Sequence, residues 1–154
     1  YPRDSAEGRQ GHSGRDYWDG GSIEALERAI IACPETVFIG HATGFWAHIS
    51  GDEKFKEGGY PSGPVLPGGR VLEMLRKYDN LYADLSAGSG FTTVSRDGAF
   101  GRNFLIEFQD WLLFGRDHFR SELMDFLLEL DLPKEVFEKI TYRNAQKLLG
   151  CTTT

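Results

Sequence analysis

The sequence predicts an α/β fold with parallel strands. Three short apolar runs, at residues 36–41, 80–86 and 111–117, each end in polar residues, and a stretch with helical spacing follows each run. Alternation of strand and helix is typical of parallel sheets, whose carboxyl ends carry the active sites of such folds. The pattern therefore favours an enzyme.

Length and charge narrow the class of protein. The 154 residues, 40% of them hydrophobic, suffice for one domain core. A net charge of −6 without a basic run argues against a nucleic-acid partner, and no apolar run reaches the roughly 18 residues that span a bilayer, so no membrane partner is expected. Two cysteines without zinc or disulfide spacing favour a reducing, cytoplasmic location.

The chain divides into three segments by composition. Residues 1–21 are polar and rich in glycine, and they are predicted to form a loop entered from a missing upstream part. Residues 22–150 carry all the periodic segments and form the domain. Residues 151–154 are a tail.

The first predicted unit leads to a histidine. Ser22 is a suitable N-cap for a helix over residues 22–33. The β-branched and aromatic run 37–39 predicts a buried strand that delivers His41 to its carboxyl end. Residues 44–69 are too long for an ordinary connection and predict a functional loop with short helical turns.

The second unit places two polar side chains on one face of a strand. A helix is predicted over residues 70–78, with a buried stripe of Val71, Leu72 and Leu75. The next strand starts at Asn80. Strand alternation puts Leu81, Ala83 and Leu85 on one face and Tyr82, Asp84 and Ser86 on the other.

The third unit ends in an aspartate. Residues 87–100 are rich in glycine and serine and predict a loop, after which Phe104, Leu105 and Phe108 mark a helix. The strand at 111–114 leads to Asp117. Helices are then expected at 121–130 and 136–149, with Pro133 in the first turn of the second and Gly150 at its end.

Three strands alone make an incomplete sheet. Both edges would be bare, and unpaired backbone at a sheet edge is a liability. A (β/α)8 barrel takes about 250 residues, close to 31 for each unit. We therefore expect the last three units of a TIM barrel, incomplete in this chain.

His41 and Asp117 are the candidate catalytic residues. His41 follows a glycine at a strand end and could be a metal ligand, a general base or an electrophile, or it could simply bond a loop carbonyl. Asp117 could bind a metal, because a carboxylate at the end of an apolar strand needs a partner or a cation. It could instead cap the next helix or pair with Arg116 or Arg120.

Four further residues are candidate substrate-binding positions. Asp84 and Ser86 could contact substrate or orient a ligand, although a structural role is also open. His48 and Trp46 lie in the aromatic loop and could meet substrate, whereas packing of the loop is the commoner use of such aromatics. His118 is expected to be exposed.

Four motifs in this order resemble the carboxyl-terminal part of the amidohydrolase superfamily. They are Phe38-Ile-Gly-His-Ala42, Asn80-Leu-Tyr-Ala-Asp-Leu-Ser86, Leu112-Leu-Phe-Gly-Arg-Asp117 and Asn144-Ala-Gln-Lys-Leu-Leu-Gly150. The nearest resemblance is to the amidohydrolase-2 branch, TIM-barrel metal-dependent hydrolases related to aminocarboxymuconate-semialdehyde decarboxylase.

The resemblance implies a divalent metal, often zinc, and roles for two residues. Asp117 would match the aspartate of the eighth strand, which binds the metal and takes a proton from its water. His41 would match the histidine of the sixth strand, which polarises substrate or orients the nucleophile. The family's His-x-His pair and fifth-strand histidine have no counterpart here, so the zinc ligands are incomplete in this chain.

Three hypotheses follow. The first is a metal-dependent hydrolase of a small lactone, amide or ester, inactive as this chain alone, with a nonoxidative decarboxylase as the alternative within the family. The second is a noncatalytic fragment or relic that self-associates, as a homo-oligomer or with the missing amino-terminal part. The third is a small complete domain of flavodoxin-like type.

Overall fold

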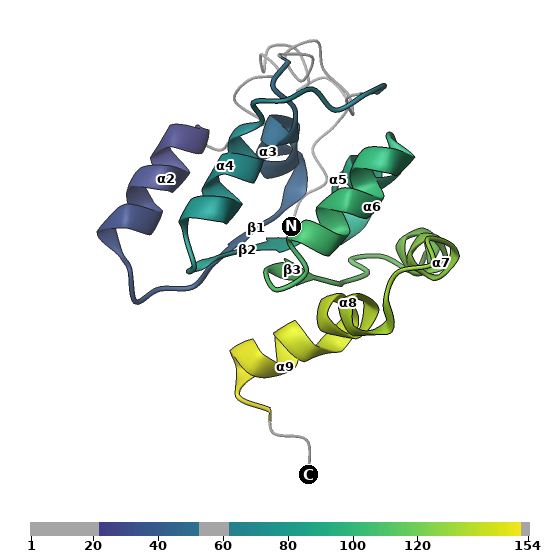
Figure 1. Cartoon of the computed structure of the whole chain (residues 1–154). Helices are drawn as coiled ribbons and strands as arrows, with labels where there is room; N and C mark the ends of the chain where they lie inside the picture. The colour runs from purple at the N-terminus through teal and green to yellow at the C-terminus, as the bar shows by residue number, and fades with distance from the viewer. Residues whose placement is uncertain (1–21, 53–61, 152–154) are drawn as a thin grey trace, which may run out of the picture.

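Three parallel strands form one open sheet in the order β1-β2-β3, which confirms the predicted α/β class (Figure 1). The computed structural model describes residues 22–52 and 62–151. The strands are β1 (Phe38–Gly40), β2 (Leu81–Asp84) and β3 (Leu112–Leu113). The predicted loop 1–21, part of the loop 44–69 and the end of the tail lie outside the described residues.

Helices follow every strand, as the periodicity predicts. Those expected at 22–33, 70–78, 121–130 and 136–149 all form, the last as two α-helices joined by a π-helical segment, η4. Among the described residues, no helix is long and apolar enough to cross a membrane. The helices are α2 (Ile23–Ala32), α3 (Ala42–Trp46), α4 (Arg70–Lys77), α5 (Ala87–Ser95), α6 (Gly98–Glu107), α7 (Glu122–Glu129), α8 (Lys134–Glu138), η4 (Lys139–Arg143), α9 (Asn144–Leu149) and a 3-10 turn, η2 (Ala47–Ile49).

Helices α2 and α4 lie side by side next to the β1 edge of the sheet (Figure 1). Ser22 caps α2 as predicted, since its hydroxyl accepts a hydrogen bond from the Ala25 amide at 3.2 Å. Glu27 of α2 accepts bonds from Tyr78 and Lys77 and pairs with Arg70 of α4. The Tyr78 hydroxyl, followed by the Lys77 and Arg70 charges, lowers the pKa of Glu27.

The predicted loop over 87–100 is wrong, because most of this segment is helical. Residues 87–95 form α5, and α6 begins at Gly98. Two glycines of these helices let the helix backbone approach neighbouring backbone closely, and they do not mark an irregular loop. A Cβ at Gly90 would stand 2.2 Å from the Leu85 carbonyl oxygen, and one at Gly101 would stand 1.9 Å from that of Val94. Glycine content therefore marks tight helix packing here.

The strand predicted at 37–39 forms, as β1 over residues 38–40, but the prediction that it is buried is wrong. Val37 is 48% exposed and Ile39 54%, because β1 is an edge strand with one face in solvent. Gly40 at its end is buried, and a Cβ there would overlap the Phe45 ring at 2.4 Å.

The outer edge of β3 is not bare, contrary to the expectation of two open edges. The Phe114 amide donates to the carbonyl of Ile140 in η4 at 2.9 Å. The Asn144 side-chain amide donates to the Leu112 carbonyl at 2.8 Å. The carboxyl-terminal helices thus satisfy polar backbone groups on the outer edge of β3.

The core lies between the sheet and its helices. Leu81, Ala83 and Leu85, predicted to share one face of the strand, are fully buried. On α4 the buried residues are Val71, Met74 and Leu75, while Leu72 packs at the margin of the core. The largest side chains with almost no exposed surface include Phe104, Phe108, Ile30, Ile49, Met74, Leu112, Leu127 and Ile140.

Candidate functional site

The carboxyl edge of the sheet gathers the candidate residues and holds unusual backbone. Three non-glycine residues there have a left-handed conformation, Ala42 (φ 65°), Ala87 (φ 61°) and Asp117 (φ 59°), and one follows each strand. Such conformations cost free energy for residues with a Cβ, and they persist where the surrounding structure enforces them, commonly at functional sites. The positive φ angles of these three residues therefore mark the carboxyl edge as a candidate functional site.

His41, Asp84 and Ser86 form one hydrogen-bonded group across β1 and β2. The Nδ1 of His41 lies 3.0 Å from Oδ2 of Asp84. The Ser86 hydroxyl donates to the same oxygen at 2.7 Å, and the Ser86 amide donates to Oδ1 at 2.8 Å. The structure thus brings together three of the residues that the sequence singled out from two different units.

Trp46, which belongs to an aromatic cluster, and Gly115 both contact the hydrogen-bonded group of His41, Asp84 and Ser86. The Trp46 indole donates to the Asp84 carbonyl at 3.0 Å, and its ring makes edge contacts with Phe45 and Phe104. A Cβ at Gly115 would lie 3.1 Å from Cβ of Ser86 and 3.3 Å from Oδ1 of Asp84. Backbone of the third unit therefore packs directly on the carboxylate.

The bond to Asp84 at Nδ1 leaves Nε2 as the ring nitrogen of His41 that can accept a proton or bind a metal. A carboxylate that accepts from Nδ1–H keeps the neutral ring in the tautomer whose Nε2 is unprotonated, as in histidines that act as bases or metal ligands. The His41 side chain is 41% exposed, so Nε2 can meet a ligand. The buried Ser86 hydroxyl lies 3.4 Å from Nδ1 of His41 but donates to Asp84 at 2.7 Å, so with Nδ1 protonated the histidine is not the base for this hydroxyl.

Asp117 lies on the exposed loop after β3. Both structural alternatives for it are wrong: Ser121 occupies the N-cap position of α7, and Asp117 makes no ion pair with Arg116 or Arg120. Its role as a metal ligand stays a prediction.

A complete metal site is not present in the described part of the chain. No group of three or more histidine, cysteine, aspartate or glutamate side chains is arranged to hold an ion among residues 22–52 and 62–151. Structural zinc sites take four ligands and catalytic ones three from the protein. Asp117 and His41 by themselves therefore do not fit a zinc centre.

The aromatic loop places its two candidates differently. Trp46 is buried, with 3% of its surface exposed, and its contacts are those of the core. His48 lies half-buried in η2. Near it, the pKa of Glu24 is lowered by its own backbone amide and the Ser22 hydroxyl, with a smaller effect of His48. Substrate contact by either residue stays a prediction.

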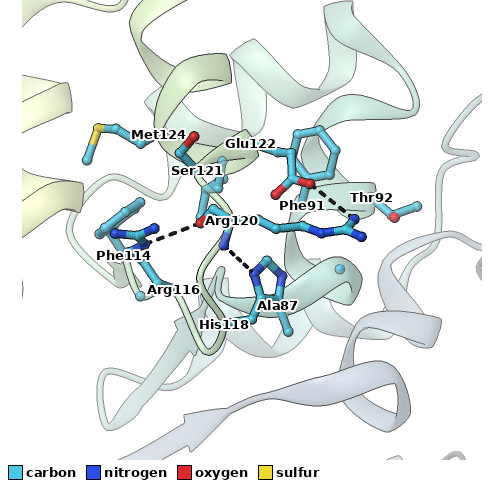
Figure 2. Close-up of a pocket in the computed structure, with 13 residues that line it drawn as sticks. Ala87, Phe91, Thr92, Phe114, Arg116, His118, Arg120, Ser121, Glu122 and Met124 are labelled. Carbon is cyan, nitrogen blue, oxygen red and sulfur yellow. Dashed lines mark hydrogen bonds and ion pairs between the residues drawn. The ribbon is translucent and has the colours of Figure 1, made fainter.

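A cavity of about 170 Å³ that was not predicted from the sequence lies beside the site (Figure 2). It lies between α5 and the segment that leads from β3 into α7. His118, expected to be exposed, is exposed and also lines it. The sequence feature that indicates this cavity is the cluster of Arg116, His118 and Arg120 directly after the third strand. The lining comprises Ala87, Gly88, Phe91, Thr92, Phe114, Gly115, Arg116, His118, Arg120, Ser121, Glu122, Leu123 and Met124.

Comparison of the chain with protein-family models, with curated proteins and with solved structures found no match. The chemistry of the carboxyl edge is what remains to indicate a function.

Proposed function

We propose that this chain forms the last three βα units of a barrel hydrolase that acts on a small carbonyl substrate, a lactone, an amide or an ester. His41 would accept or relay a proton at Nε2 during attack by water on the carbonyl carbon. The observation that carries the proposal is the Asp84 carboxylate bound to Nδ1 of His41 at 3.0 Å across two strands.

The strand order supports the barrel part of the proposal. Consecutive units of a barrel place their strands side by side in chain order, and the described sheet runs β1-β2-β3 with parallel pairing throughout. A doubly wound sheet reverses its order at a switch point, and no reversal occurs among the described strands. The sequential order is that of three consecutive barrel units, and strands 3, 4 and 5 of a flavodoxin-like sheet have the same order.

The divalent metal, zinc by resemblance, needs ligands from the five remaining units. Asp117 is the one ligand proposed from this chain. When bound, such a metal lowers the pKa of its water to about 7. Since the described residues do not complete the site, we assign to this chain only the positioning of His41 and the wall formed by Asp84 and Ser86.

The test compares this chain with a polypeptide that carries all eight units, both supplied with zinc. The chain alone is expected to retain less than one zinc after gel filtration and to hydrolyse no lactone or ester above the buffer rate. The complete barrel is expected to turn over such a substrate, and His41→Asn there should lower kcat by about 100-fold or more. A complete barrel that is unaffected by His41→Asn would contradict the proposal.

A self-associating fragment is the second candidate, and the edge strand favours it. Val37 and Ile39 expose about half of their surface on β1, whose outer edge makes no strand pairing in the described sheet. A second copy could cover this edge by strand pairing or by apolar packing.

A further inference from the structure

We propose that the cavity between α5 and α7 binds a small organic acid, an anionic oxygen group attached to a compact apolar body. Its lining has cationic donors together with an apolar wall, and it adjoins the His41–Asp84 pair. Figure 2 shows the Arg120 side chain extended across the cavity, with His118 below it and Phe91 behind.

The cationic donors come from the loop after β3. Arg116 donates from Nε to the Arg120 carbonyl at 3.2 Å and from Nη2 to the Phe119 carbonyl at 2.7 Å. These bonds fix its guanidinium, and Nη1 keeps no partner among the described residues. Arg120 pairs through Nη1 with Glu122 at 3.3 Å, which leaves Nε and Nη2 as donors.

His118 adds a donor even when it is neutral. Its Nδ1 accepts the backbone N–H of Arg120 at 3.1 Å. An acceptor at Nδ1 requires the proton of the neutral ring to be on Nε2, so this nitrogen donates. The loop is thus cross-linked to itself by Arg116 and His118, and N–H groups of three side chains, those of Arg116, His118 and Arg120, remain to donate.

The charges of the lining residues favour a ligand with one negative charge. Two arginines face one carboxylate, that of Glu122, so the formal sum is positive with neutral His118. The first residues of α5, Ala87 and Gly88, also line the cavity, and the amino end of a helix adds partial positive charge. A singly charged oxyanion would complete this balance.

The remaining lining selects for an apolar body. Phe91, Phe114, Leu123 and Met124 supply carbon surface. The pocket is open to solvent where Arg120 lies exposed, and its volume of about 170 Å³ is no smaller than an enclosed cavity of about 150 Å³ known to hold benzene. It therefore has room for a single ring or a short branched chain. A carboxylate on such a body matches both parts of the lining.

The cavity and the His41 group share a wall. Ala87 follows Ser86 directly in the chain, and Gly115 lines the cavity while its backbone packs on Ser86 and Asp84. A bound acid would therefore lie next to the group that handles the proton. Its use as a substrate subsite rests on the proposed function, whereas the binding of the anion does not.

The experiment is calorimetric titration of the full chain with benzoate, with neutral benzamide and with inorganic phosphate. Saturable benzoate binding is expected, with an affinity at least about tenfold higher than for either of the other two. Arg120→Gln should weaken benzoate binding about tenfold, and Arg28→Gln, an equal charge change on exposed α2, should not. Circular dichroism of both variants confirms that they fold.

Three outcomes would overturn the proposal: no saturable benzoate binding, equal binding of benzamide, or phosphate binding as tight as benzoate. Equal weakening by Arg120→Gln and Arg28→Gln would also overturn it, since that would indicate only a general charge effect. Calorimetry measures benzoate binding without any turnover, so a failure of the proposed hydrolase can be distinguished from a failure of the anion site.

Discussion

Asp84 at the end of β2 accepts a hydrogen bond from His41 at the end of β1, with 3.0 Å between Oδ2 and Nδ1. These residues are 43 positions apart in the chain, and parallel pairing of Gly40 with Ala83 sets them side by side. The pair is the chemical centre of the carboxyl edge, and its properties can be tested without knowledge of any substrate.

Asp84→Ala should change the tautomer of His41. With its carboxylate acceptor removed, Nδ1–H loses its stabilisation, and the fraction of rings protonated at Nε2 should rise. The free energy of unfolding should also fall by roughly 1–3 kcal/mol, because Ser86 loses bonds from its amide and its hydroxyl. Nitrogen-15 chemical shifts of the imidazole measure the tautomer. A wild-type ring protonated at Nε2 would contradict the assigned geometry.

Gly115→Ala and Gly98→Ala should change the free energy of unfolding in opposite directions. A Cβ at Gly115 meets Ser86 at 3.1 Å, so the alanine should destabilise the fold by about 1–2 kcal/mol and disturb the His41 resonances. A Cβ at Gly98 meets nothing within 4 Å, and this residue opens α6, so alanine there should stabilise by roughly 0.4–1 kcal/mol. Urea unfolding of both variants checks the difference in sign.

Asn144→Ala should be strongly destabilising for a single polar residue. Its buried amide donates to the carbonyls of Gln109 at 2.7 Å and Leu112 at 2.8 Å, and both acceptors lose their partner in the variant. We expect a loss of about 2–4 kcal/mol in the free energy of unfolding. Lys147→Ala, on the exposed face of α9, is the control and should change stability by less than about 0.5 kcal/mol.

Asp97 should make stability depend on acid pH. Hydrogen bonds from the backbone amides of Phe100 and then Val65 lower its pKa below the ordinary value of 3.8. A lowered pKa in the folded state means that this stabilisation is complete above the unfolded pKa and is lost as pH falls through the folded value. Asp97→Asn should therefore be less stable than wild type at pH 7, and the gap should shrink below about pH 4.

The comparison for Asp97 is a series of urea unfolding curves from pH 7 to pH 3. Asparagine at this position can still cap α6 through its one carbonyl oxygen, but its NH2 group cannot accept the bond that the Val65 amide donates to Asp97. The change of the gap with pH, rather than its size at pH 7, therefore reports the effect of the charge. A gap between the two proteins that stays constant across this range would contradict the assigned cause.

Ile39→Lys should weaken self-association if the β1 edge is an interface. A lysine on an exposed edge strand opposes edge-to-edge pairing. Sedimentation velocity of the wild-type chain is expected to show a dimer that dissociates in the variant. Ile31→Lys, another exposed apolar position but on α2, serves as the control. A compact wild-type monomer would remove the second candidate function.

Much of the fold follows from local pattern in the sequence. Helical spacing and the caps Ser22 and Gly150 are properties of neighbouring residues, so the periodicity predicts α2, α4, α7 and the carboxyl-terminal helices. The prediction of a loop over residues 87–100 is wrong because glycine, judged from neighbouring residues alone, is typical of loops. Only the packing of Gly90 on Leu85 and of Gly101 on Val94 explains why those residues are glycines in helices.

For the candidate site too, some features follow from the sequence and others only from the tertiary structure. By itself, the sequence determined that parallel strands deliver His41, Asp84 and Asp117 to one edge, because strand alternation and chain order settle that much. Only the tertiary structure decided that His41 binds Asp84 while Asp117 bonds to neither of them, and that Arg116, His118 and Arg120 line a cavity with α5. Those relationships depend on strand register and on how loops pack, and both are set by contacts between residues far apart in the chain.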